Sequence, residues 1–99
     1  MENSNNEQYV YLLVVRTLSV DKTTLHYDVT PFKTLDDVND AVLDSITNKA
    51  KTNRGEIYYI KYIPRDNIDI SENSHTPCGK VVFKSTVEVM YTVLRRKIK

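Results

Sequence analysis

Seven consecutive apolar residues near the start of the chain, Tyr9 to Val15, constrain the fold more than any other segment. A strand that is apolar at every position is buried on both faces, whereas a half-exposed strand alternates between apolar and polar side chains. The segment 9–15 is therefore predicted to be a central strand of a sheet.

The next segment, residues 23–29, has the alternating pattern of a strand with one face exposed to solvent. A polar turn, Ser19-Val20-Asp21-Lys22, separates the two segments. We therefore expect them to pair as an antiparallel hairpin. Pro31 should end the second strand, because proline has no N–H to donate to a ladder.

A helix is predicted over about residues 34–52. Thr34 is a favourable N-cap, and Asp37 three residues later approximates a capping box. Apolar residues recur at helical spacing at Leu35, Val38, Val42 and Ile46. Gly55 is a plausible stop signal beyond the last turn.

Residues 54–64 hold three of the seven tyrosines and read as a strand that ends at Pro64. Alternation places Tyr58, Ile60 and Tyr62 on one face, and Ile57, Tyr59, Lys61 and Ile63 on the other. Both faces are mostly apolar, which predicts a second inner strand. Tyr58, Ile60 and Tyr62 are a candidate interface, covered either by the chain's own helices or by a second subunit.

The C-terminal third is less determined. Residues 65–78 form a long polar connection, and residues 79–84 read as a strand. Residues 85–98 fit a strand by their β-branched residues, but they also fit a helix, because Ser85 and Glu88 form a capping box. We favour the helix, with the strand left open.

These elements predict a single small α+β domain in the order ββαββα, with an antiparallel sheet of about four strands and two helices on one face. Residues 1–7 are expected to be a flexible N-terminus and residues 8–99 the domain. The lone Cys78 excludes an internal disulfide. No signal peptide and no apolar run of membrane-spanning length occurs in the sequence, which predicts a cytoplasmic protein without membrane contact.

Two resemblances bear on fold and origin. The segments Arg16-Thr17-Leu18, Thr24-Leu25 and Thr34-Leu35-Asp36-Asp37-Val38 resemble the first hairpin and helix of ubiquitin-like β-grasp proteins over residues 16–38. The resemblance implies fold alone, because the chain ends Lys97-Ile98-Lys99 without the Gly-Gly that conjugation requires. In length, tyrosine content and lack of motif, the chain is similar to small orphan accessory proteins of crenarchaeal filamentous and rod-shaped viruses, which would place it in the host cell cytoplasm.

No catalytic or metal-binding set is predicted. His75 and Cys78 lie three residues apart, but structural zinc takes four ligands, and His26 is the only other histidine or cysteine. A Cys–His nucleophile would also need a positioned base, so an idle thiol in a turn is the favoured interpretation. With only Gly55 and Gly79, the chain has no glycine-rich phosphate loop.

Charge is distributed unevenly along the chain. Residues 79–99 carry a net charge of +5 and the rest carries −4. The basic candidates for contact with a nucleic acid or an acidic partner are Lys80, Lys84, Arg95, Arg96, Lys97 and Lys99. The candidates for docking a basic partner are Asp36, Asp37, Asp40 and Asp44, which otherwise form a solvated helix face.

The predicted function is therefore that of a non-enzymatic accessory protein, viral in origin, that acts by surface contact with a host or viral protein and forms a homodimer. Nucleic-acid binding through the basic C-terminal segment is the alternative. No cofactor or metal is expected.

Overall fold

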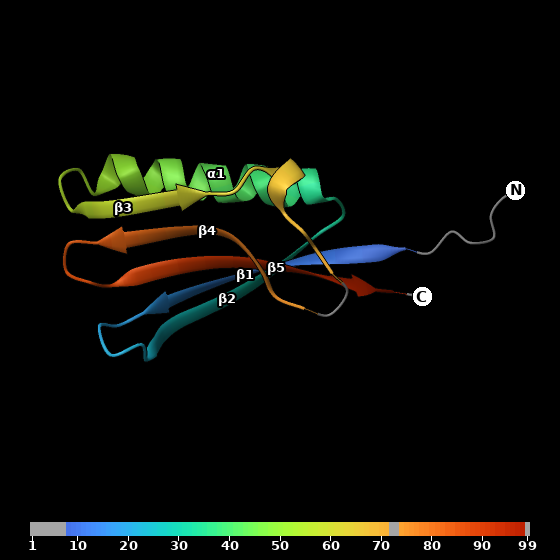
Figure 1. The fold of residues 1–99 in the computed structure, drawn as a ribbon, viewed down its shortest axis with the longest axis horizontal. Helices are drawn as coiled ribbons and strands as arrows, with labels where there is room; N and C mark the ends of the chain where they lie inside the picture. The colour runs from blue at the N-terminus through green and yellow to red at the C-terminus, as the bar shows by residue number, and fades with distance from the viewer. Residues whose placement is uncertain (1–7, 72–73, 99) are drawn as a thin grey trace, which may run out of the picture.

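The computed structural model describes residues 8–71 and 74–98, so the predicted flexible segment 1–7 lies outside the described residues. The elements are β1 (Tyr9–Leu18), β2 (Thr24–Phe32), α1 (Leu35–Thr52), β3 (Ile57–Tyr62), the 3₁₀ turn η1 (Arg65–Asn67), β4 (Thr76–Phe83) and β5 (Glu88–Lys97). The strands form one antiparallel sheet in the order β2-β1-β5-β4-β3, with α1 packed on one face (Figure 1). The α+β class is confirmed, with five strands and one helix in place of the expected four and two.

The hairpin pairing and the helix were predicted correctly, but Pro31 does not end the second strand, because β2 includes it and continues to Phe32. β1 pairs with β2 in antiparallel register. At the start of α1, the Thr34 side chain accepts a hydrogen bond from the Asp37 backbone N–H at 3.1 Å. The helix ends at Asn53, whose N–H returns to the Lys49 carbonyl, and Gly55 follows with a φ of 79°. Glycine suits this turn because it adopts a positive φ without steric cost.

The predicted C-terminal helix is wrong, because residues 88–97 form β5, the middle strand of the sheet. β5 pairs with β1 over ten consecutive residues and with β4 on its other edge. Ser85 and Glu88 do not form a capping box, because Glu88 is buried on the sheet and forms an ion pair with Lys22. Tertiary pairing therefore outweighed a local pattern that suited both structures.

The prediction that residues 57–63 form an inner strand is also wrong, because β3 lies at the edge of the sheet. Apolar residues on both faces of a strand indicate that both faces are covered by other parts of a protein. They do not indicate how many strands hydrogen-bond to that strand. β1 is an inner strand as predicted, but the centre of the sheet is β5.

The core lies between α1 and the sheet. Val38, Val42 and Ile46 on α1 are buried against residues of all the inner strands. Gly79 lets the two layers approach closely, since a Cβ there would lie 3.1 Å from Val42 Cγ1. The fully buried Tyr91 shares a hydrogen bond of 2.7 Å between its hydroxyl and that of Ser45 on the helix.

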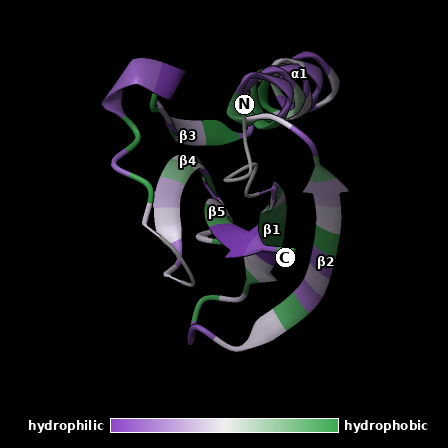
Figure 2. Ribbon diagram, turned by 90° about the vertical axis from the view of Figure 1, so that its right-hand side faces the viewer, coloured by the Kyte–Doolittle hydropathy of each residue, from purple (hydrophilic) through white to green (hydrophobic). Residues whose placement is uncertain are grey.

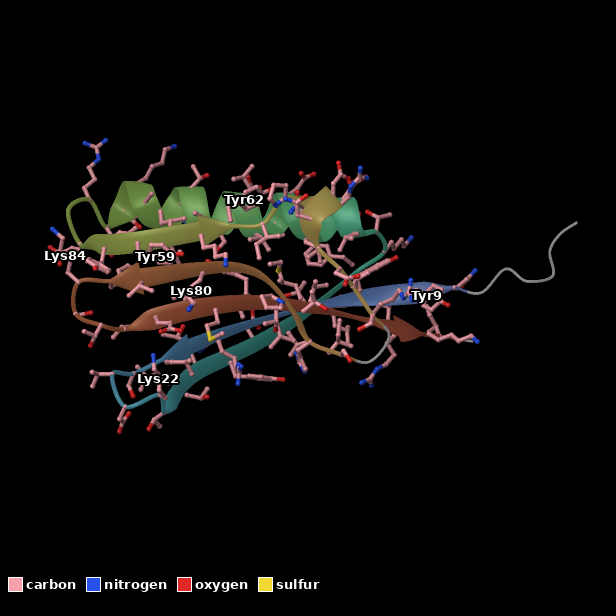
Figure 3. All side chains as sticks on the ribbon, viewed as in Figure 1. Tyr9, Lys22, Tyr59, Tyr62, Lys80 and Lys84 are labelled. Carbon is pink, nitrogen blue, oxygen red and sulfur yellow. The ribbon has the colours of Figure 1, made fainter. Side chains whose placement is uncertain are left out.

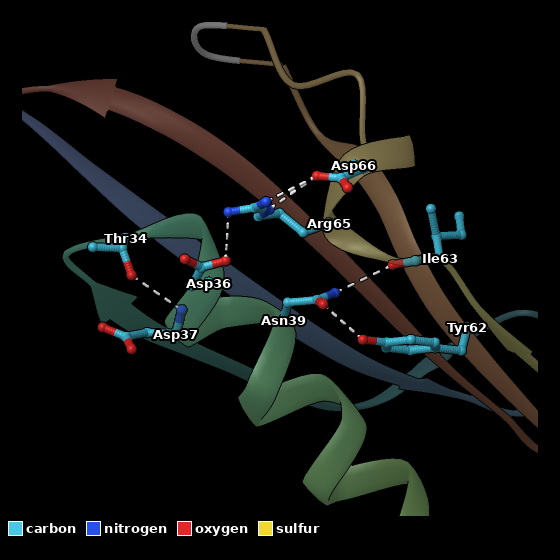
Figure 4. A network of polar contacts seen from close by, with 8 residues as sticks. All are labelled: Thr34, Asp36, Asp37, Asn39, Tyr62, Ile63, Arg65 and Asp66. Atoms are coloured by element: carbon cyan, nitrogen blue, oxygen red, sulfur yellow. Dashed lines mark hydrogen bonds and ion pairs between the residues drawn. The ribbon is translucent and has the colours of Figure 1, made fainter.

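Polar contacts fasten the start of α1 to β3 and η1 (Figure 4). The Asn39 side chain accepts a hydrogen bond from the Tyr62 hydroxyl at 2.7 Å and donates to the Ile63 carbonyl at 3.3 Å. Arg65 in η1 forms ion pairs with Asp36 at 2.8 Å and with Asp66 at 2.9 Å. The connection after β3 is therefore held against the helix.

The opposite face of the sheet carries no helix. Viewed end-on in Figure 2, α1 lies at the top, β2 runs along the right side and β4 along the left, with β1 and β5 between them. Core residues such as Val15, Val81 and Val89 point toward α1. Their strand neighbours at alternate positions therefore point the other way, onto what we call the helix-free face.

Candidate functional site

A row of side chains crosses the helix-free face from one edge of the sheet to the other. The strand registers place five residues in direct succession, each opposite the next: Lys61, Lys80, Met90, Arg16 and Tyr27. Directly opposed residues project from the same face of a sheet. The row, which we call the cross-strand row, spans four strand spacings, or about 19 Å.

A tyrosine and two further lysines lie beside this row. Tyr59 on β3 is 46% exposed and, with Lys61, Lys80 and Met90, lines a shallow pocket of about 230 Å³. Lys22 in the β1–β2 turn and Lys84 in the β4–β5 turn lie toward the same end of the sheet (Figure 3). We call the cross-strand row together with Tyr59, Lys22 and Lys84 the cationic face.

Glu88 is the only carboxylate among the strand residues of the helix-free face that the structure describes, and it is buried. It accepts a hydrogen bond from Lys22 Nζ at 2.9 Å and lies 3.7 Å from Lys80 Nζ. The hydrogen bond from Lys22 and the charge of Lys80 lower the pKa of Glu88, although burial opposes the shift. Glu88 therefore stays ionised and anchors the β1–β2 turn on the central strand.

Lys61 and Lys80 are directly opposite each other, although like charges in that arrangement destabilise a sheet. Over residues 8–71 and 74–98, neither Lys61 nor Arg16 forms an ion pair. Lys61 and Arg16 thus carry positive charge that no described carboxylate neutralises, whereas Lys80 shares Glu88 with Lys22.

The basic residues predicted from the sequence do not form one patch. Lys80 and Lys84 belong to the cationic face, whereas Arg95, Arg96 and Lys97 lie at the far end of β5. Arg96 lies six positions along β5 from Met90, the neighbour of Lys80, or roughly 20 Å along a strand. The strand also places Arg95 on the helix side, with its guanidinium 4.4 Å from the centre of the Tyr9 ring. Lys99 lies outside the described residues.

The acidic candidates all lie on α1, on the other side of the molecule. Asp36 is paired with Arg65, and Asp37 provides the backbone N–H that Thr34 caps. Asp40 and Asp44 are exposed. The four acidic candidates therefore lie in the helix layer, on the opposite side of the sheet from the cationic face.

The candidate interface of Tyr58, Ile60 and Tyr62 is divided by the fold. Register places Ile60 opposite Val81 and Tyr62 opposite Gly79, on the helix side. Tyr62 is half-buried and bonded to Asn39, so the chain's own helix covers it. Tyr58, at the register shift after Ile57, is 76% exposed, and Ile60 is 40% exposed.

The remaining chemical candidates, His75 and Cys78, lie in different surroundings. Cys78 is completely buried in the core, and burial raises its pKa to about 12. Its thiol is therefore protonated at neutral pH, a state that does not favour nucleophilic attack. His75 is exposed, with Nδ1 3.4 Å from the Thr92 hydroxyl. No group of three or more metal-ligating side chains occurs in the part of the chain that the structure describes.

Sequence reasoning missed Arg16, Lys22 and Lys61 as members of the site. A signal was present for two of them, because Lys61 interrupts the tyrosine run and Arg16 directly follows the apolar run of β1. A charged residue within an otherwise apolar strand marks a position that faces solvent or a partner. The sequence alone could not show that the two lie in one row.

Comparison with known proteins yields no relative, since no family model, curated protein or solved structure matches the chain. The viral origin and the ubiquitin-like pattern therefore stay predictions. Among the described residues, no helix combines the length and apolar character needed to cross a membrane.

Proposed function

We propose that this protein is a non-enzymatic binding protein that holds single-stranded nucleic acid on its cationic face. The cross-strand row is the observation that carries the proposal. It brings three cations from three strands, Lys61, Lys80 and Arg16, into one line, in which only Lys80 has a carboxylate, Glu88, within ion-pair distance among the described residues. Nucleic acid binds such a surface because lysine and arginine side chains displace the counterions condensed on its phosphates.

The shape of the site favours a single strand over a duplex. A duplex is read by an element narrow enough for a groove about 12 Å wide, such as a helix or a two-stranded ribbon. The cross-strand row spreads over five strands instead. Its tyrosines, Tyr27 at 57% exposure and Tyr59 beside the row, offer ring faces on which unpaired bases can stack.

Fluorescence anisotropy with a labelled oligo(dT), titrated at several salt concentrations, tests the proposal. Each phosphate contact contributes a slope of about −0.7 to the dependence of log K on log salt for a single strand. Arg16→Gln and Lys61→Gln should each reduce the slope by about 0.7. Tyr59→Ser should weaken binding through lost stacking with the slope unchanged.

Lys51→Gln is the matched control, because Lys51 is exposed in the last turn of α1, away from the helix-free face. It should bind like the unmodified protein. A failure to bind oligo(dT) at low salt, or an equal loss in the Lys51 control, would refute the proposal.

A second candidate function is contact with a host or viral protein, as the sequence analysis predicted. The observation in its favour is the exposed edge of the sheet at β3, where Tyr58 and Ile60 present apolar surface next to unpaired backbone groups. Lysine blunts a strand edge, so Ile60→Lys should abolish the binding of any partner that adds a strand there. A partner captured equally by Ile60→Lys would exclude this edge.

A further inference from the structure

The other edge of the sheet is the long strand β2. All of its residues are exposed except Phe32, which is partly buried. An edge strand presents a row of unpaired N–H and C=O groups to any strand that can pair with it. Natural edges are protected by charged residues such as lysine, by proline, by bulges, by short length or by a covering element. β2 has nine residues and no lysine, and its proline, Pro31, lies next to its last residue, so residues 24–30 offer a long edge.

Pro31 shows which backbone groups of β2 face outward. It lies within the strand, opposite Leu12, and has no N–H. Proline fits a ladder where its nitrogen points away from the neighbouring strand. Alternation then directs the N–H and C=O groups of Tyr27 and Val29 toward the free edge as well. The side chains of the same two residues are 57% and 41% exposed on the helix-free face.

We propose that β2 pairs in antiparallel orientation with β2 of a second copy of this chain, about a two-fold axis at Tyr27. This register places Leu25 opposite Val29 of the partner subunit and His26 opposite Asp28 of the partner subunit. An apolar pair and a complementary polar pair thus occur twice in the interface. The structure describes no ion pair of His26 or Asp28 within the chain, so both are available for this contact.

Neighbouring registers are less favourable. An axis at Asp28 would oppose the two Asp28 carboxylates, and like charges directly opposite each other destabilise a sheet. An axis at His26 would oppose the two imidazoles and leave Asp28 facing Thr24 of the partner subunit. The match of an imidazole N–H donor on His26 with a carboxylate acceptor on Asp28 therefore selects the axis at Tyr27.

The pairing would join two helix-free faces into one ten-stranded sheet. Tyr27 is the last residue of the cross-strand row at the β2 edge, with Arg16 next to it. The two rows would consequently meet end to end at the new junction. This consequence rests on the proposed function and predicts that the dimer occupies about twice the length of oligonucleotide that a monomer does.

Sedimentation velocity over a wide range of protein concentration, without nucleic acid, tests the interface. The unmodified protein should dimerise, and Val29→Lys should abolish the dimer. His26→Glu should weaken it about tenfold, because it places two pairs of carboxylates opposite each other. Adding Asp28→Lys to His26→Glu restores opposite charges and should restore the dimer. Circular dichroism of each variant establishes that the monomer is folded.

Ile60→Lys on the opposite edge is the matched control and should dimerise normally. A protein that stays monomeric at every concentration overturns the proposal. So does a dimer that Ile60→Lys breaks and Val29→Lys does not, or a charge exchange that fails to restore association. If Val29→Lys is monomeric and still binds oligo(dT), the interface and the nucleic-acid function are both supported and separable.

Discussion

Replacing Lys61 by glutamate should make the protein more stable and less able to bind nucleic acid. Lys61 and Lys80 face each other on adjacent strands, and their like charges destabilise the pair by about 0.2–1 kcal/mol. Lys61→Glu removes this repulsion and substitutes an attraction of similar size. Because both effects act in the same direction, we expect the free energy of unfolding to rise by about 0.5–1.5 kcal/mol.

Urea denaturation measures the change. With an m-value of about 1 kcal/mol/M for a small domain, the midpoint should move upward by about 0.5–1.5 M. Lys61→Gln, which removes the repulsion without adding an attraction, should give roughly half of the shift. In 1 M salt the Debye length falls to about 3 Å, so the gain should shrink for both variants.

The same variants then enter the oligo(dT) titration. Lys61→Glu places a negative charge within the cross-strand row, so its affinity should fall further than that of Lys61→Gln. A lower stability of Lys61→Glu would refute the pairing of Lys61 with Lys80 or the repulsion between their charges. Increased stability with unchanged binding would mean that the opposed lysines do not contact the nucleic acid.

Three further predictions concern the support of the site. Because its pKa is lowered from the usual 4.5, ionised Glu88 stabilises the fold at pH values above 4.5, and this stabilisation is lost as the pH falls through the lowered pKa. Glu88→Gln should therefore lower the free energy of unfolding at neutral pH, and in acid the free energies of the variant and the unmodified protein should become equal. Cys78 should react with a thiol reagent at pH 8 only as fast as the chain unfolds; rapid reaction under native conditions would contradict its burial. Gly79→Ala should lower the melting temperature, because overpacking at this position costs about 1–3 kcal/mol of unfolding free energy. Val42→Ala should partly restore stability in the double variant, since Val42 Cγ1 is the atom nearest to the added Cβ. Stability losses that simply add in the double variant would exclude this contact.

Sequence reasoning succeeded where a structure depends on neighbouring residues. The cap of Thr34 on Asp37 and the buried stripe of α1 were both predictable, because their partners lie within a few residues. It failed at residues 85–98, where a capping box and helical spacing coexisted with β-branched residues. Pairing with β1 and β4 decided that segment, and those partners lie far away in the chain.

The candidate site was predictable only in part, for the same reason. Lys80 and Lys84 were named from the charge of the C-terminal segment, but that segment was expected to gather its cations at a helix end. As a strand it sends Arg96 roughly 20 Å from Lys80 along the strand direction and turns Arg95 toward α1.

The sequence by itself determined the β1–β2 hairpin and α1, because their signals lie within a few residues, and it left residues 85–98 open between helix and strand. It also determined that residues 79–99 carry a net charge of +5 and the rest of the chain −4. Only the tertiary structure decided which strand lies beside which, since backbone hydrogen bonds form equally with any strand that reaches them. That order brings Arg16 beside Met90 and Lys80 beside Lys61, and so assembles one cationic row from residues distant in the sequence.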